Sequence, residues 1–115
     1  MSAETYRRSN EIENFLRYTL NPKRGSEQDN KLKGAFEGIV HYENGGSLLN
    51  RSQIKREFDW LRKKFATALE KLANPTYSDQ VENLNCLIQT AEDSEDIWNI
   101  FNQMKELKEK VFRSA

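Results

Sequence analysis

The sequence predicts an all-α fold: a small antiparallel bundle of about five helices, formed by residues 1–115 as a single domain. Apolar residues recur at spacings of three and four in five segments, which is the period of amphipathic helices. Polar capping residues, glycine or proline bound each segment. The composition is 37% hydrophobic and 31% charged. Each helix should therefore combine a narrow apolar stripe with a wide charged face.

The first helix is expected to run from Asn10 up to Asn21–Pro22. Asn10 and Glu13 have the spacing of a capping box, and the residue before a proline disfavours helical backbone. Residues 1–9 are expected either to add an earlier turn or to fray, and residues 21–30 to form a loop. The apolar positions on its buried face are Ile12, Phe15, Leu16 and Leu20.

The second helix is expected to follow this loop, with Asn30 as its cap and Glu43–Gly46 as its end, because glycine readily adopts the left-handed conformation there. A competing interpretation is a β-hairpin over residues 39–49 that turns at Asn44–Gly45. The helical period fits the apolar residues better than the alternation of a strand does. These apolar residues are Leu32, Ala35, Phe36, Ile39 and Val40.

The third helix is the longest. Asn50 and Gln53 have the spacing of a capping box at its start, and Asn74–Pro75 ends it. Its apolar residues form a heptad seam of about three repeats, which is too short for a free coiled coil but suits a bundle. The seam consists of Ile54, Phe58, Leu61, Phe65, Ala68 and Leu72.

Two further helices complete the predicted bundle. The fourth is expected to open at Asp79 with Glu82 in capping register. The fifth is expected to have Ser94 as its cap, with Glu95 and Asp96 in its first turn, where negative charge complements the helix dipole. Their stripes are Val81, Leu84, Ile88 and Ala91, and then Ile97, Ile100, Phe101, Met104, Leu107 and Val111.

The cysteine content and the hydropathy favour a cytoplasmic protein. Cys86 is the one cysteine, so no intramolecular disulfide is available and a reducing compartment is expected. The first residues lack the apolar run of a signal peptide. No stretch approaches the ~18 apolar residues of a membrane span, so no membrane association is expected.

The sequence offers little catalytic or metal-binding chemistry. A nucleophilic pair requires Cys86 beside His41, the one histidine. Cys86 lies in an ordinary helical pattern and is expected to be a buried, inert thiol. Glu37 and His41 share a helix face, but a bundle metal site needs more ligands, so a surface ion pair or hydrogen bond is expected. We therefore expect no catalytic, cofactor or metal site.

The net charge of zero hides an uneven distribution. Residues 1–65 contain 13 basic and 9 acidic residues, whereas residues 66–115 contain 5 and 9. Residues 79–96 hold six acidic residues and no basic one. On the third helix, Trp60 lies about 120° from the apolar seam at about 100° per residue. Basic side chains surround it on that face: Arg56, Lys63, Lys64 and Lys71.

The first hypothesis is a non-catalytic helical protein–protein interaction module, such as an adaptor, a regulator or an assembly subunit. Homodimer formation is part of this hypothesis. An aromatic anchor among complementary charges is typical of such interfaces, so the partner should present an acidic surface. The hypothesis also predicts an exposed apolar patch. The predicted partner-binding residues are Arg56, Trp60, Lys63 and Lys64.

The alternative hypothesis is a nucleic-acid-associated subunit that contacts the phosphate backbone through the helix at 51–64. Cations beside an aromatic ring are typical of single-strand binding, although a net charge of zero is unusual for such proteins. A third interpretation is structural: Trp60 packs against a neighbouring helix, and the basic face pairs with residues 79–96. The nucleic-acid hypothesis assigns phosphate contacts to Arg51, Lys55, Arg56, Arg62, Lys63 and Lys64.

Overall fold

The computed structural model describes residues 2–114 and contains helices but no strand in that range. The all-α class is therefore confirmed, and the hairpin considered for residues 39–49 is wrong. None of the described helices combines the length and apolar content needed to cross a membrane. The helices are α1 (Ala3–Leu20), α2 (Glu27–Leu32), α3 (Ala35–Glu43), α4 (Arg51–Leu72), the 3-10 helix η1 (Pro75–Tyr77), α5 (Ser78–Thr90) and α6 (Ser94–Ser114).

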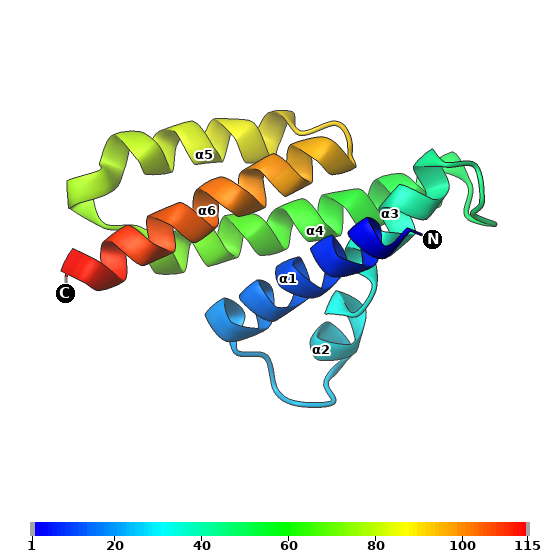
Figure 1. Ribbon diagram of the computed structural model, residues 1–115, viewed down its shortest axis with the longest axis horizontal. Coiled ribbons are helices and arrows are strands. Elements are labelled where there is room, and N and C mark those ends of the chain that lie inside the picture. The colour runs from blue at the N-terminus through cyan, green and yellow to red at the C-terminus, as the bar shows by residue number, and fades with distance from the viewer. Residues whose placement is uncertain (1, 115) are drawn as a thin grey trace.

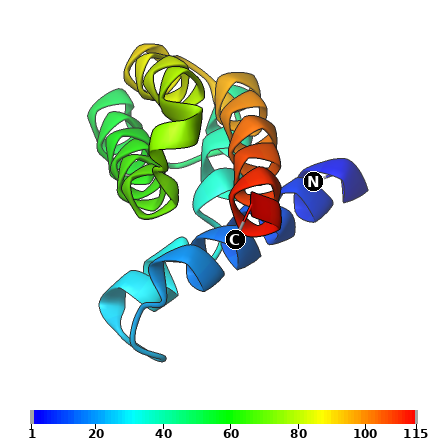
Figure 2. The same ribbon diagram turned by 90° about the vertical axis from the view of Figure 1, so that its left-hand side faces the viewer.

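Helices α4, α5 and α6 run up and down beside one another, as short connections require (Figure 1). Figure 2, in which α4, α5 and α6 are viewed nearly end-on, shows that α1 crosses this three-helix bundle obliquely. Helix α1 contacts α3, α4 and α6. Helix α2 contacts the bundle mainly through α1 and is the peripheral element. The whole measures 45 × 30 × 25 Å.

The buried apolar side chains form one core cluster centred on α4 and α6. The predicted heptad seam of α4 is buried except at Phe58, which is half-buried. Fully burying one such large apolar side chain contributes roughly 1.5–3 kcal/mol. The largest fully buried side chains are Phe65, Phe101, Leu16, Leu61, Leu69, Leu84, Ile97, Ile100, Met104 and Leu107.

Helix α1 begins seven residues before the predicted cap. Ser2 is the true N-cap, because its Oγ accepts a hydrogen bond of 3.2 Å from the backbone N–H of Thr5. Asn10 lies inside the helix, so the predicted capping box at Asn10 is wrong. The first turns are held by the burial of Ser9 against the core and by exposed ion pairs of Arg7 and Arg8. Residues 3–9 are therefore helical rather than frayed.

The segment predicted as a loop followed by one helix contains two helices. Ser26 caps α2, since its Oγ accepts the N–H of Asp29 at 3.2 Å, so the loop is confined to residues 21–26. Asn30 lies within α2 and is not the cap of α3. Gly34 separates α2 from α3 with a φ of 73°, a left-handed conformation that side chains other than glycine rarely adopt.

The N-terminal cap of α4 was predicted correctly from the sequence, whereas that of α6 was not. The capping box of Asn50 and Gln53 is confirmed, with reciprocal bonds of 2.9 and 2.8 Å. Helix α6 is capped by Asp93, whose Oδ1 accepts the N–H of Asp96 at 2.9 Å. Ser94 is not the predicted cap, because its N–H and Oγ–H donate to the Glu43 carboxylate at the end of α3.

Candidate functional site

The basic residues of the predicted nucleic-acid face lie mainly on two sides of α4. One group lines an apolar hollow of about 380 Å³ formed with the end of α3 and the link between α5 and α6. The other group lies on the side of α4 that carries Trp60. The first group is Arg51, Lys55 and Arg62, and the second is Arg56 and Lys64, each one turn from Trp60. Lys63 lies between the two groups, because it lines a third hollow together with Arg62.

Trp60 is half-buried and packs against the edge of the core. Two ammonium groups lie over its ring: Nζ of Lys31 is 4.9 Å from the centroid and Nζ of Lys64 is 5.4 Å away. Lys31 belongs to α2, so the ring is covered by a neighbouring element as the structural interpretation anticipated. Arg56 and Lys63 are exposed. Among the predicted partner-binding residues, Trp60 is thus an aromatic ring with two lysine ammonium groups over it, and not a fully exposed aromatic side chain.

The guanidinium of Arg62 contacts other groups of the bundle on α4 and α5. Its Nη1 donates to the backbone carbonyl of Gln89 on α5 at 2.8 Å. Its Nη2 pairs with Asp59 one turn earlier. The guanidinium also lies 5.6 Å from the centroid of the Phe58 ring. The hydrogen bond from Arg62 to Gln89 therefore links α4 to α5.

The acidic segment 79–96 does not pair with the basic face. Its interhelical ion pair joins Glu95 to Arg8 of α1 at 2.9 Å. No ion pair in the described part of the chain joins residues 51–64 to residues 79–96. The predicted internal neutralisation of the basic face is therefore wrong.

Cys86 and His41 are both exposed, on α5 and α3 respectively. The prediction that Cys86 is buried is wrong. It lies two positions from each of the buried residues Leu84 and Ile88, which places it on the opposite side of α5. Glu37 forms no ion pair or hydrogen bond with His41 within residues 2–114. The same residues hold no cluster of three or more potential metal ligands.

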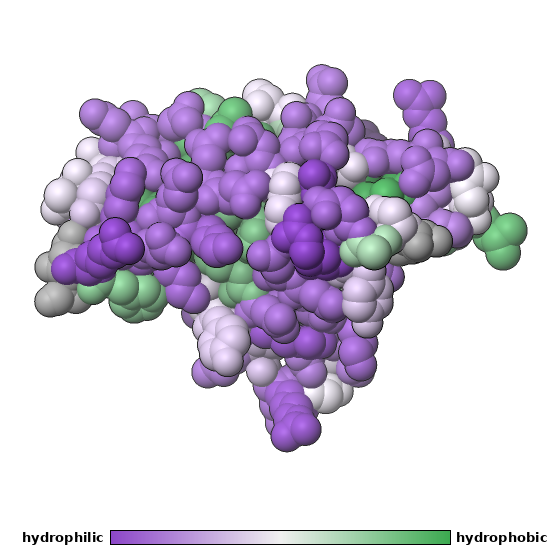
Figure 3. Space-filling view, in the orientation of Figure 1, coloured by the Kyte–Doolittle hydropathy of each residue, from purple (hydrophilic) through white to green (hydrophobic). Residues whose placement is uncertain are grey.

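A groove with a volume of about 560 Å³ lies between α1 and α6. We call it the aromatic groove. It arises because α1 crosses the bundle obliquely, so the two axes separate on one side of the crossing (Figure 2). Hydrophobic surface is visible between the two helices in Figure 3. Its lining residues are Glu11, Asn14 and Phe15 of α1, and Phe101, Lys105, Lys108, Glu109, Phe112 and Arg113 of α6.

Aromatic rings form the floor and one wall of the groove. Phe15 and Phe101 meet edge to face in the floor, with centroids 5.5 Å apart and an interplanar angle of 86°. Phe112 forms the wall and is 64% exposed, and Tyr18 beside the groove is 83% exposed. Two large exposed rings beside a buried pair make an apolar patch of the kind that marks binding surfaces.

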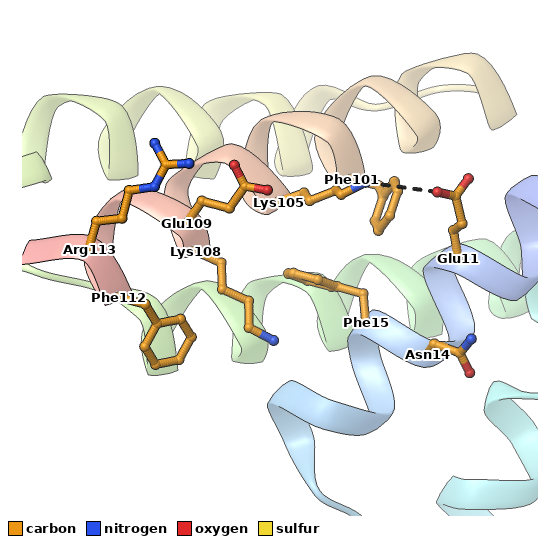
Figure 4. A pocket seen from close by; sticks show the side chains of 9 residues that line it. All are labelled: Glu11, Asn14, Phe15, Phe101, Lys105, Lys108, Glu109, Phe112 and Arg113. Atoms are coloured by element: carbon orange, nitrogen blue, oxygen red, sulfur yellow. Dashed lines mark ion pairs between the residues drawn. The ribbon is translucent and has the colours of Figure 1, made fainter. Parts of the chain in front are cut away.

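Lys108 lies at the centre of these rings. Its Nζ is 5.2 Å from the centroid of Phe15, 5.9 Å from that of Tyr18 and 5.8 Å from that of Phe112. Figure 4 shows the side chain extending between Phe112 on one side and Phe15 on the other. Lys108 forms no ion pair with any described residue. The negative faces of the three rings therefore attract its charge in place of a carboxylate.

The charged lining of the groove is partly satisfied within the chain. Glu11 pairs with Arg7 at 2.7 Å and with Lys105 at 3.8 Å (Figure 4). Lys108 and Arg113 have no carboxylate partner in residues 2–114. Within the lining of the groove, the charged α6 side chains without an ion pair in residues 2–114 are therefore two cations, Lys108 and Arg113, and one carboxylate, Glu109.

The residues of this groove were not predicted to bind a partner. Phe15 and Phe101 were predicted core residues, and they are buried. The apolar stripes predicted from the sequence include neither Phe112 nor Tyr18. The signal was the spacing of Phe101, Lys105, Lys108 and Phe112, which repeats at four, three and four and places aromatic and basic residues on one side of α6.

Comparisons of the chain with protein-family models, with curated proteins and with solved structures each gave no significant match. The function is therefore argued from the geometry of the groove and of the Trp60 face.

Proposed function

We propose that the protein is a non-catalytic helical interaction module and that another protein docks in the aromatic groove. The observation that carries the proposal is the pair of exposed rings, Phe112 and Tyr18, beside a groove floored by Phe15 and Phe101. The interaction surface expected from the sequence was the Trp60 face. The groove is the better candidate, because Phe112 and Tyr18 are exposed to a partner whereas Trp60 is half-buried.

The occupant we propose is an amphipathic helix with acidic residues flanking its apolar face. Two helices that diverge at a floor of aromatic rings form a groove in which a third helix can bury apolar side chains. Among the cations that line the groove, Lys108 and Arg113 have no carboxylate partner in the described chain. Carboxylates on the docked helix would pair with them and orient it.

The proposal is tested by selection from a displayed library of amphipathic helical peptides on the immobilised protein. The enriched peptides should carry apolar residues at helical spacing together with aspartate or glutamate. Phe112→Ala should weaken their binding by at least about tenfold, since a central aromatic anchor contributes more than about 1 kcal/mol. Isothermal calorimetry on one enriched peptide measures the change.

Tyr6→Ala is the matched control, because Tyr6 is 60% exposed on the same helix as Tyr18 but does not line the groove. It should leave the affinity unchanged. Equal losses in Phe112→Ala and Tyr6→Ala, or enriched peptides without acidic residues, would contradict the proposal. Light scattering before the selection tests whether a second copy of the chain occupies the groove. A stable dimer that Phe112→Ala dissociates would mean that a second copy, and not another protein, fills the groove.

A further inference from the structure

We propose a second, independent binding site for a nucleotide unit in the hollow beside Trp60, with the base on the indole and the phosphate on surrounding lysines. The hollow has a volume of about 540 Å³, within the range of small-ligand sites. It lies between α4, the peripheral helix α2 and the loop before α2. Its lining residues are Pro22, Lys23, Ser26, Glu27, Gln28, Lys31, Trp60 and Lys64.

The first argument is the grouping of positive charge. Lys23, Lys31 and Lys64 converge on the hollow from three different segments, and Glu27 is its one acidic lining residue. None of the three lysines forms an ion pair with a described residue. Three unpaired ammonium groups in one hollow repel one another, and a phosphate bound among them replaces that repulsion with attraction.

The second argument is the ring. Lys31 and Lys64 share the single ring of Trp60, with their Nζ atoms 4.9 and 5.4 Å from its centroid. Both side chains are flexible, so their ammonium groups can leave the ring for a phosphate. The indole face that they release is suited to stacking on a base, which is how single-strand binding proteins hold nucleotides. Cations and ring together match a nucleotide better than a plain anion.

This site differs from the one predicted for the helix at 51–64. Its cations include Lys23 and Lys31 from outside that helix, whereas Arg51 and Lys55 lie at the other hollow. The nucleotide is therefore proposed to lie in the hollow between α4 and α2, and not along the length of α4. The proposal is independent of peptide docking in the aromatic groove, so either can fail alone.

The test uses the full chain and a labelled single-stranded oligothymidine at low salt, with binding followed by fluorescence anisotropy. Lys31→Glu/Lys64→Glu should weaken binding at least tenfold. The matched control is Arg51→Glu/Lys55→Glu, which makes the same change in charge with both substitutions on α4, the helix that also carries Lys64. It should weaken binding less than threefold. Far-UV circular dichroism checks that both variants retain their helices.

The role of the ring is tested separately in a Trp98→Phe background, in which Trp60 is the one tryptophan. Oligothymidine should quench its emission, and the affinity should fall as salt rises, with a log–log slope of about −0.7 for each phosphate that the lysines neutralise. Thymidine monophosphate that quenches at similar concentrations identifies a free nucleotide as the ligand. Quenching by the oligomer alone identifies a strand.

Three results would overturn the proposal. The first is no binding at low salt. The second is an equal loss of affinity in the two charge-reversed variants, which would reflect general attraction to the protein. The third is quenching by polyglutamate as strong as by oligothymidine, which would make the hollow a site for acidic protein segments and not for nucleotides.

Discussion

The two aromatic sites of this molecule combine rings and cations in opposite proportions. In the aromatic groove, one ammonium group, that of Lys108, lies over three rings. At the other site, two ammonium groups, those of Lys31 and Lys64, lie over the single ring of Trp60. The groove therefore offers mainly apolar surface with one central charge, and the Trp60 hollow offers mainly charge around one stacking surface.

The difference shows that the proportion of rings to cations, and not their mere proximity, distinguishes the two surfaces. Apolar area removed from water contributes about 25 cal/mol per Å², so a ring-rich groove favours an apolar partner helix. A cation-rich hollow gains instead by neutralising phosphates, which makes its binding depend on salt.

The largest effect is expected from Phe101→Ala, because Phe101 is 2% exposed and contacts both Phe15 and Trp98. Its loss should reduce the free energy of unfolding by roughly 3–5 kcal/mol. Phe112→Ala, one wall of the same groove, should change it by less than about 0.5 kcal/mol. Urea denaturation measures both. A large loss for Phe112→Ala would mean that the exposed ring stabilises the fold and is not free for a partner.

The next largest loss of stability is expected at the contact between the start of α6 and the end of α3, because α6 forms one side of the groove. Glu43→Ala removes the acceptor for the N–H and the hydroxyl of the buried Ser94. Leaving these donors unsatisfied should cost about 1–3 kcal/mol. Glu37→Ala is the control, since Glu37 on the same helix forms no such bond. Similar thermal shifts for the two variants would contradict the importance of this contact.

A smaller effect is expected where a single cation is removed from each site. Lys108→Met keeps an unbranched stem but removes the charge from three rings, and it should reduce stability by about 0.5–1 kcal/mol. Lys31→Met should cost less, because Lys64 remains over the ring of Trp60. Chemical denaturation of both variants gives the order. A larger loss of stability for Lys31→Met than for Lys108→Met would contradict the idea that one lysine interacts with three rings in the groove while two lysines share the ring of Trp60.

The smallest effect is a pH-dependent one at the contact that holds α2 beside the bundle. The backbone N–H of Gly25 and the guanidinium of Arg17 hold the pKa of the Asp29 carboxyl below its ordinary value. A lowered pKa in the folded state stabilises the protein above the unfolded pKa of about 4, and this contribution disappears as the pH falls through the folded value.

Asp29→Asn should therefore be less stable than the original protein near neutral pH, and the difference should shrink below about pH 4. Denaturation series at several pH values measure it. The same variant should loosen α2 and change the emission of Trp60, because Lys31 of α2 lies over that ring. A pH-independent difference would mean that ionisation of Asp29 does not contribute.

The helices could be predicted from the sequence where local signals agreed. The heptad seam of α4 and the capping box of Asn50 and Gln53 are both present in the structure. The predictions failed where a long-range contact replaced a local signal. Ser94 has the properties of a cap, but its hydroxyl bonds Glu43, which is 51 residues away in the sequence. Asn10 resembles a cap, but burial of Ser9 against the core extends α1 through it.

The candidate sites depended on tertiary geometry even more strongly. The basic and aromatic residues around Trp60 were visible in the sequence, but Lys31 reaches the ring only because α2 folds back beside α4. The groove requires the oblique crossing of α1 over α6, which periodicity does not specify. The spacing of Phe101, Lys108 and Phe112 indicates a shared side of α6, yet it does not say whether α1 covers that side.

The most direct test of the proposed docking function is chemical-shift mapping by NMR. The isotope-labelled protein is titrated with an acidic amphipathic peptide enriched by selection on the original chain. We predict that the largest shifts fall on the groove residues Phe15, Lys108 and Phe112, while Trp60 and Lys31 do not move. Shifts centred on Trp60, or spread evenly over the surface, would contradict the assignment of the aromatic groove as the docking site.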